Sequence, residues 1–280
     1  MKDDTKLPNV LNTSITTNDK LISEKESLKS LNYENNKVRI RGYQNEQGFF
    51  IVNWCFLTNE YKYLHEWRFT KALRLALSIC LGQLVEVISV ELKHHHRTIN
   101  TFSKFRDPKS LEYFSPIYKD TFDYELFGSI LENQIEHKQY HEIVSMLFYR
   151  IVDAFKTGSF NLWGFMIPTT LEAILRTFEG KPFKEKKKED TWRFQSSMSL
   201  LKNEFFSNQH IKDYRDVFNH ASTYYIKLRN RNVHPDWINN KSDHINTESY
   251  RQILYLVKFY GYLIRAFVGA EIIKPELAPV

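Results

Sequence analysis

The spacing of hydrophobic positions in the first half of this chain is that of β-strands and one helix. From Val38 apolar residues alternate with polar ones or form short runs, as in 49–57 and 84–92, which is typical of strands. The positions Val38 and Ile40 and the run 49–57 flank the Gly-containing connector 45–48, which predicts a β-hairpin. Residues 63–81 carry apolar positions at helical spacing and are followed by a glycine, a common end of a helix. We therefore expect a small α+β unit over residues 35–120.

From about residue 121 the spacing becomes helical. Pro168 occupies what is typically the first position of a helix, and the last helix carries apolar residues along one face. Short connections between such helices predict a helical bundle over residues 121–280. The fold class is therefore expected to be mainly α, with this bundle preceded by the small α+β unit. The expected helices of the bundle are 133–156, 168–180, 191–206, 211–233 and 247–273.

The first 34 residues are polar, rich in Asn, Thr, Ser and Lys, and show little periodicity. We expect residues 1–34 to form a flexible arm. This segment has no continuous apolar stretch of the kind that secretion signals contain. No stretch of the chain approaches the roughly 18 apolar residues of a membrane helix. A cytoplasmic protein with no membrane partner is expected.

The composition permits an anionic partner. The formal net charge is +6, and aromatic residues, which offer stacking faces to bases, make up 15% of the chain. The basic run Lys184–Lys188 is either a solvated loop or an additional contact to RNA. Cys55 and Cys80 both lie in apolar runs, which indicates core thiols in a reducing compartment.

Two groups of histidines are candidate metal ligands. Three consecutive side chains, as in His94–His96, cannot all face one ion from regular structure, so a surface run is favoured. His137 and His141 stand four apart, a spacing that binds zinc on one helix face, but no third ligand accompanies them. We therefore expect no metal and no other cofactor.

The strongest candidate for chemistry lies at the end of the helix predicted over 211–233. The chain there presents Arg229, Asn230, Arg231 and His234 before Pro235. The residue before a proline is pushed out of helical geometry, so the helix should end near His234. These groups are thus expected on its last turn. The apolar stripe of this helix is predicted to comprise Val217, Ala221, Tyr224 and Leu228.

These residue types suit RNA cleavage without a metal. Arg229 offers a planar fork for two phosphate oxygens, and His234 titrates near neutral pH. In such a reaction the ribose 2′-OH attacks phosphorus, a base takes its proton, and an acid protonates the leaving oxygen. One histidine supplies half of that acid–base pair. A symmetric dimer that joins two motifs would supply both.

The motif resembles the signature of the HEPN superfamily, in which Arg is followed after four to six residues by His, often with Asn directly after the Arg. Arg229, Asn230 and His234 match this signature with a spacing of four. The segment around Glu172 is similar to the helix that supplies a polar partner in many members. The resemblance covers roughly residues 125–275.

The resemblance implies a metal-independent endoribonuclease that acts as a homodimer and leaves 2′,3′-cyclic phosphate ends. It implies Arg229, Asn230 and His234 as the catalytic residues and Glu172 as the group that positions them. Such proteins serve as toxins or as antiviral abortive-infection effectors, so a phage-derived trigger or an antitoxin is an expected partner. Arg231 and Lys227 are candidates for RNA contacts. The unit over residues 35–120 would sense the trigger or restrain the nuclease.

Other interpretations stay open. Arg229 and His234 also suit the C-terminal end of a helix, where cations are favoured, and Glu172 is equally consistent with a solvated carboxylate. A HEPN-like bundle that only binds or dimerises is the main alternative. A regulator that binds DNA or RNA without cutting it is a third hypothesis.

Overall fold

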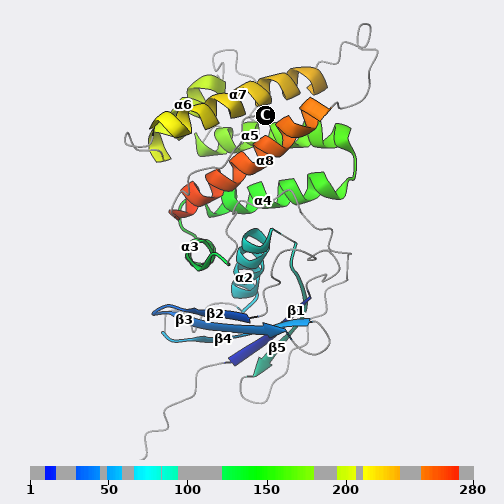
Figure 1. Ribbon diagram of the computed structural model, residues 1–280. Coiled ribbons are helices and arrows are strands. Elements are labelled where there is room, and N and C mark those ends of the chain that lie inside the picture. The colour runs from blue at the N-terminus through cyan, green and yellow to red at the C-terminus, as the bar shows by residue number, and fades with distance from the viewer. Residues whose placement is uncertain are drawn as a thin grey trace, which may run out of the picture. The chain divides into compact units, whose positions relative to one another are not determined.

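The structure is a computed structural model that describes residues 10–16, 30–44, 49–58, 66–82, 84–93, 122–179, 194–205, 211–233 and 247–270. It is mainly helical, with one antiparallel sheet (Figure 1). The chain divides into two compact units. Among the described elements, unit 1 contains the sheet with helices α2 and α3, and unit 2 contains helices α4 to α8.

The sheet of unit 1 has five strands in the order β2-β3-β4-β1-β5, and neighbouring strands pair antiparallel. The predicted hairpin is confirmed, because β3 pairs with β4 from Val38 opposite Phe56 to Gln44 opposite Phe50. The predicted strand before residue 93 is also confirmed. The strands are β1 (Val10–Thr16), β2 (Ser30–Glu34), β3 (Val38–Gln44), β4 (Phe49–Phe56) and β5 (Glu86–Lys93).

Two of these strands correct the prediction of a flexible arm over residues 1–34. β1 lies inside the sheet between β4 and β5, and β2 forms its edge beside β3. The prediction was wrong for these stretches because a polar strand gains its order from ladder hydrogen bonds with partner strands, which local composition does not record. The partners of β1 are distant in sequence, whereas β2 pairs with the next strand, β3. The other residues of the arm lie outside the described part of the chain.

Helix α2 (Glu66–Leu81) packs its apolar stripe on the sheet. Phe69 contacts the rings of Trp54 and Phe56 on β4, with centroids 5.0 Å apart in each pair. These alternate residues of β4 share one face of the strand, as the period of a strand requires. Gly82 ends the helix with a φ of 63°, as the sequence predicted, because glycine adopts this left-handed conformation without strain.

The single helix predicted from residue 133 to residue 156 is two helices. α3 (Tyr124–Ile135) begins after Asp123, whose carboxylate accepts the Leu126 N–H at 3.1 Å. A turn with left-handed backbone at His137 and Tyr140 separates it from α4 (His141–Lys156). The prediction was wrong because apolar spacing continues across a turn that backbone geometry interrupts. The structure groups α3 with the sheet, whereas the prediction counted residues from 121 onward with the bundle.

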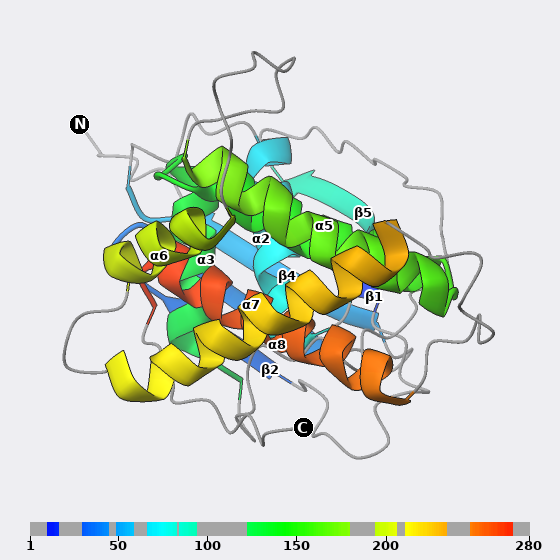
Figure 2. The same ribbon diagram turned by 90° about the horizontal axis from the view of Figure 1, so that it is seen from above.

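Unit 2 is a bundle of five helices in the described part of the chain. α7 has the predicted bounds, and α6 and α8 lie within their predicted ranges. Figure 2 shows α7 crossing α8 and reaching α5 with its C-terminal half. Among the described residues, no helix is sufficiently long and apolar to traverse a bilayer. The remaining bounds are α5 (Phe160–Phe178), α6 (Phe194–Phe205), α7 (Ile211–Val233) and α8 (Thr247–Val268).

Helix α5 does not begin at Pro168, as the sequence predicted, but at Phe160. A proline inside a helix has no N–H to donate and commonly kinks or breaks the helix. Side-chain hydroxyls donate to two carbonyls near the proline. The Thr170 hydroxyl donates to the Met166 carbonyl at 2.7 Å, and the Tyr260 hydroxyl of α8 donates to the carbonyl of Ile167. The helix continues through the proline from Phe160 to Phe178.

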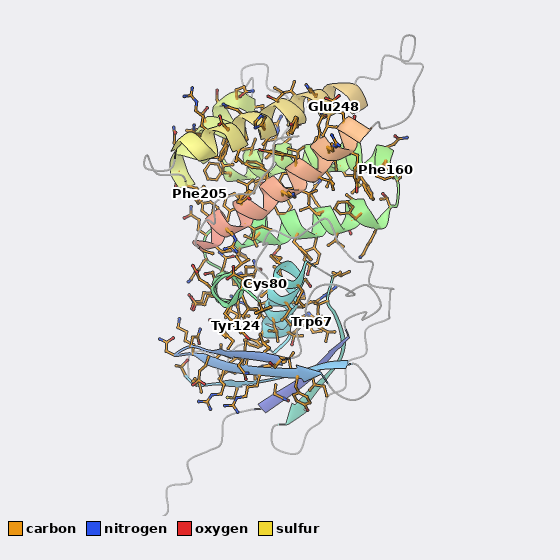
Figure 3. All side chains as sticks on the ribbon, in the orientation of Figure 1. Trp67, Cys80, Tyr124, Phe160, Phe205 and Glu248 are labelled. Carbon is orange, nitrogen blue, oxygen red and sulfur yellow. The ribbon has the colours of Figure 1, made fainter. Side chains whose placement is uncertain are left out.

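An aromatic cluster holds one end of the bundle together. Tyr140 lies 5.9, 5.4 and 5.1 Å from the ring centroids of Phe178, Phe205 and Phe267, respectively. Phe205 at the end of α6 is labelled in Figure 3. The rings meet edge-on or tilted, the arrangements that aromatic pairs prefer. The cluster thus joins the turn before α4 to three helices of the bundle.

Replacing Tyr260 with Phe should destabilise unit 2. Tyr260 is fully buried, so the change leaves the Ile167 carbonyl without the hydroxyl and keeps the ring. We expect the free energy of unfolding, measured with urea by circular dichroism, to fall by about 1 kcal/mol. Tyr149→Phe is the control, because Tyr149 is 37% exposed, and it should change the value by less than about 0.5 kcal/mol. Equal losses in both variants would contradict this role of the Tyr260 hydroxyl.

Candidate active site

A buried carboxylate lies at the contact between α5 and α7. Glu172 is on the fourth turn of α5, and its side chain is 12% exposed. Arg176, one turn later on the same helix, donates from Nε and Nη2 to its Oε1 at 3.3 and 3.1 Å. The spacing of four residues places both side chains on one helix face. One oxygen of the carboxylate is therefore occupied from within α5.

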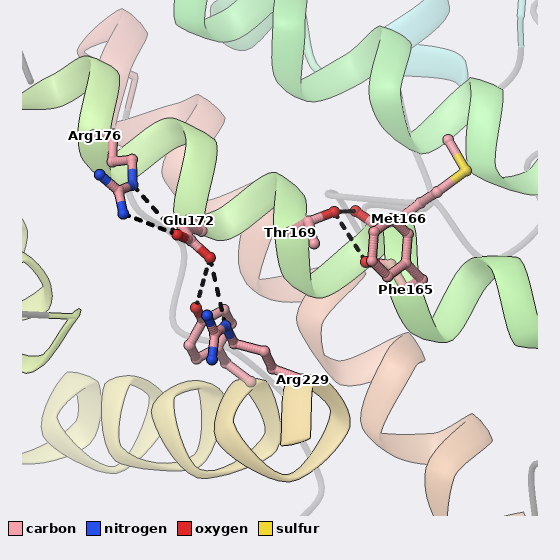
Figure 4. Close-up of polar contacts among 7 residues, drawn as sticks. Phe165, Met166, Thr169, Glu172, Arg176 and Arg229 are labelled. Carbon is pink, nitrogen blue, oxygen red and sulfur yellow. Dashed lines mark hydrogen bonds and ion pairs between the residues drawn. The ribbon is translucent and has the colours of Figure 1, made fainter. Parts of the chain in front are cut away.

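The other oxygen of Glu172 faces α7. The Tyr225 hydroxyl donates to Oε2 at 3.1 Å, and Arg229 Nε lies 3.6 Å from the same oxygen. Tyr225 and Arg229 are again four residues apart, so α7 presents them together. Figure 4 shows Glu172 between Arg176 and Arg229, with dashed lines to both. Two guanidinium groups and one phenol thus surround one carboxylate.

This arrangement satisfies a charge that the bundle would otherwise leave buried. A buried carboxylate is tolerated when it is paired and its remaining oxygen lone pairs accept hydrogen bonds. Burial raises the pKa of Tyr225 well above its ordinary value, and the negative charge of Glu172 raises it further. The phenol therefore stays protonated and donates throughout the neutral range. Its ring stacks on Phe194 of α6, with centroids 3.9 Å apart and planes at 10°.

Arg229 differs from its partners in its exposure. Its side chain is 37% exposed, compared with 22% for Arg176. The contact with Glu172 engages Nε, and a guanidinium has five N–H donors in a fixed fork. The Nη end therefore has donors to offer to a phosphate while the Nε side is held. Glu172 orients Arg229 rather than enclosing it.

The structure brings together two of the sequence-predicted site residues, Glu172 and Arg229. Asn230 and Arg231 lie in the last turn of α7, which extends to Val233, and their side chains lie outside the described part of the chain. His234 also lies outside the described residues. The position of the predicted imidazole relative to Arg229 stays a prediction.

The predicted RNA contact Lys227 does not share the helix face of Arg229. It is two residues before Arg229, which corresponds to about 200° around a helix. Lys227 pairs with Glu248 of α8, with Nζ 3.7 Å from Oε1, and both side chains are more than half exposed. Its ammonium group is therefore directed to α8 rather than to the contact between Arg229 and Glu172.

Sequence reasoning missed Arg176 and Tyr225. The signals were present as spacings of four residues, Glu172 with Arg176 and Tyr225 with Arg229. The predicted stripe of α7 instead included Tyr224, which is only partly buried, while Tyr225 is 3% exposed. Two adjacent tyrosines are indistinguishable by residue type. The contact with α5 decides which one turns inward.

The other candidate residues do not build a site among the described residues. His137 is not on a helix but in the turn before α4, where its Nδ1 lies 2.8 Å from Nε2 of His141. The described residues contain no group of three or more His, Cys, Asp or Glu side chains placed to hold a metal ion. Cys55 and Cys80 are half-buried and form no disulfide with each other. The runs His94–His96 and Lys184–Lys188 lie outside the described residues.

Replacing Tyr225 with Phe tests the hydroxyl that holds Glu172. The change keeps the ring on Phe194 and removes one hydrogen bond to a buried charge, a bond worth roughly 1.5–3 kcal/mol. We expect the free energy of unfolding to fall by about 1–2 kcal/mol, because Arg176 and Arg229 still neutralise the carboxylate.

The matched control is Tyr224→Phe, at the adjacent position of the same helix and only partly buried. It should shift the urea midpoint little. If the two variants lose stability equally, the bond between Tyr225 and Glu172 contributes nothing specific to the site.

No protein-family model matches this chain, and neither the curated proteins nor the solved structures contain a match. The site contains an oriented and partly exposed guanidinium and a buried carboxylate that holds it. A histidine follows α7 in the sequence. Together they are suited to binding a phosphate and transferring a proton next to it.

Proposed function

We propose that this protein is a metal-independent endoribonuclease of the HEPN type, with a HEPN-type bundle as unit 2. The observation that carries the proposal is the ion pair between Arg229 and the buried Glu172. The pair lies one turn before the end of α7, and His234 follows one residue after that helix. The polar partner suggested by the resemblance is thus in contact with the arginine of the motif.

In this proposal Arg229 binds the non-bridging oxygens of the scissile phosphate. The ribose 2′-oxygen forms a bond to phosphorus, and the bond from phosphorus to the 5′-oxygen breaks. The 2′-OH proton passes to one imidazole, and a second imidazole, in its protonated form, gives a proton to the leaving 5′-oxygen. Preorganised donors such as Arg229 stabilise the charge that develops on the phosphoryl oxygens. The products carry a 2′,3′-cyclic phosphate and a free 5′-OH.

Each chain contributes one His234 to this chemistry, so the acid and the base come from two copies. A homodimer with a two-fold axis at the motif meets this need. Asn230 would orient the phosphate or the imidazole. Lys227, on another side of α7 from Arg229, would contact RNA away from the scissile bond, and Lys227 and Arg231 would add salt-dependent affinity.

The biological role that we propose is that of a toxin or an abortive-infection effector. RNA cleavage harms the cell that makes the enzyme, so such an enzyme needs restraint. Unit 1 would supply it, either by sensing a phage-derived trigger or by binding an antitoxin. A cytoplasmic location follows from the substrate.

A second function is supported by the same ion pair. A carboxylate between two guanidinium groups also stabilises the packing of α5 against α7, and this structural role requires no substrate. In that case the bundle would be a binding or dimerisation module. The two functions differ in whether Arg229 and His234 are needed for RNA cleavage.

Cleavage of mixed cellular RNA in EDTA by the purified chain tests the proposal. Arg229→Ala and His234→Ala should each lower the rate at least about 100-fold, because removing one charge-stabilising or proton-transferring group costs roughly that much. The matched controls are Arg215→Ala and His220→Ala, exposed residues of the same helix. They should retain the rate within about two-fold.

A phosphatase identifies the product ends, because it removes a terminal phosphate only after a cyclic phosphate has been opened. Products that resist the phosphatase before this opening and lose phosphate after it carry 2′,3′-cyclic ends. Cleavage by the parent that both site variants retain would contradict the proposal. Loss of cleavage in the controls as well would show that the assay reports the stability of α7 rather than chemistry.

A further inference from the structure

An aromatic side chain lies exposed on the helix face that carries the site. Phe165 on α5 is 45% exposed. Seven residues separate it from Glu172, which corresponds to about two helical turns, so the two lie within about 20° of each other around the helix and roughly 10 Å apart along it. Figure 4 shows Phe165, Thr169, Glu172 and Arg176 in sequence along this helix. Phe165 thus belongs to the same stripe as the ion pairs.

Phe165 differs in its ring contacts from Phe160, the other exposed phenylalanine of α5. Phe160 is 48% exposed on the same helix, but its ring contacts Trp163 at 4.6 Å and Tyr250 at 5.4 Å. Within the described part of the chain, Phe165 makes no ring contact of this kind. Leu162, one turn before Phe165, is 46% exposed and extends the apolar surface. An aromatic face is therefore exposed on the stripe that carries the ion pairs, without a ring partner among the described residues.

The combination of this ring with the neighbouring charges indicates what it binds. Two guanidinium groups and one carboxylate meet at Glu172, which leaves a formal charge of +1 about two helical turns from the ring. A cationic groove combined with an aromatic stacking face is how proteins hold single-stranded nucleic acid. Bases of any identity stack on such a ring, because every base has a π-face.

The direction of α7 agrees with this assignment. Its C-terminal half reaches α5 (Figure 2), and Arg229 on that half contacts Glu172, on the C-terminal side of Phe165 along α5. A phosphate held by Arg229 carries a ribose and a base on each side. A base that extends along α5 toward its N-terminal half meets the Phe165 ring.

We infer that Phe165 is a stacking platform for a nucleobase adjacent to the phosphate held by Arg229. This inference rests on the proposed function and adds to it a base-binding subsite. The platform is sequence-tolerant, so it adds affinity for the strand without selecting a cleavage sequence. Single-stranded RNA is the substrate class that it fits, because the faces of a base within a duplex are already covered by stacking on its neighbours.

The test uses the full chain with His234→Ala, which keeps RNA intact, and a short fluorescent single-stranded oligoribonucleotide. A set of oligomers in which one nucleotide at a time is abasic is measured beside it. The background protein should bind one of these abasic oligomers about tenfold more weakly than the intact one, within the roughly 5- to 100-fold expected for a stacked base. The matched variants are Phe165→Leu, Phe165→Tyr and Phe160→Leu.

Phe165→Leu should bind the intact oligomer about tenfold more weakly and lose the dependence on that one base. Phe165→Tyr should keep both affinity and base dependence, because it retains an aromatic face. Phe160→Leu, about 140° around the same helix, should match the background protein. Equal affinity of Phe165→Leu and the background protein for the intact RNA would overturn the inference.

Two further outcomes separate this inference from its alternatives. If Phe165→Leu dissociates a dimer in sedimentation and weakens intact and abasic RNA alike, a second copy covers the ring and the inference is overturned. If the parent neither binds nor cleaves RNA, the proposed function fails and the subsite fails with it. Cleavage by the parent together with unchanged binding by Phe165→Leu removes the subsite alone.

Discussion

The burial of Glu172 is the constraint on which the geometry of the site depends. A carboxylate at 12% exposure is stable when opposite charges and hydrogen-bond donors replace the water that it has lost. Arg176 supplies these from α5, and Tyr225 and Arg229 supply them from α7. Because the donors come from two helices, the electrostatic requirement also determines where α7 meets α5. An arginine held in this way loses conformational freedom before any ligand arrives, and that preorganisation is what a phosphate-binding group needs.

The continuity of α5 is the second requirement, since it places Phe165 on the same stripe as Glu172. A helix that began at Pro168 would leave Phe165 in a connecting segment, without a fixed relation to the ion pairs. The Tyr260 hydroxyl of α8 donates to the Ile167 carbonyl directly before the proline, so α8 contacts α5 within this stretch.

The local spacing of apolar and polar residues predicted the elements that are stabilised mainly by burying their own apolar face. The bounds of α7, the hairpin of β3 and β4 and the glycine at the end of α2 follow from spacing and turn chemistry. The break between α3 and α4 was missed because left-handed backbone at His137 and Tyr140 leaves no mark in the apolar period. β1 was missed because its order comes from pairing with β4 and β5, which lie far along the chain. For the same reason Tyr225 could not be distinguished from Tyr224 before its contact with α5 was known.

The sequence by itself determined the helical character of the second half of the chain and the order Arg229, Asn230, His234 at the end of one helix, because apolar period and residue type are local properties. It also supplied Glu172 as a candidate partner. Only the tertiary structure decided that Glu172 is buried against Arg229, that Arg176 and Tyr225 complete its surroundings, and that Lys227 turns away toward α8. These contacts join different helices. They depend on which side chains exchange water for a protein partner when two helix surfaces pack together, and no single segment of the chain contains that information.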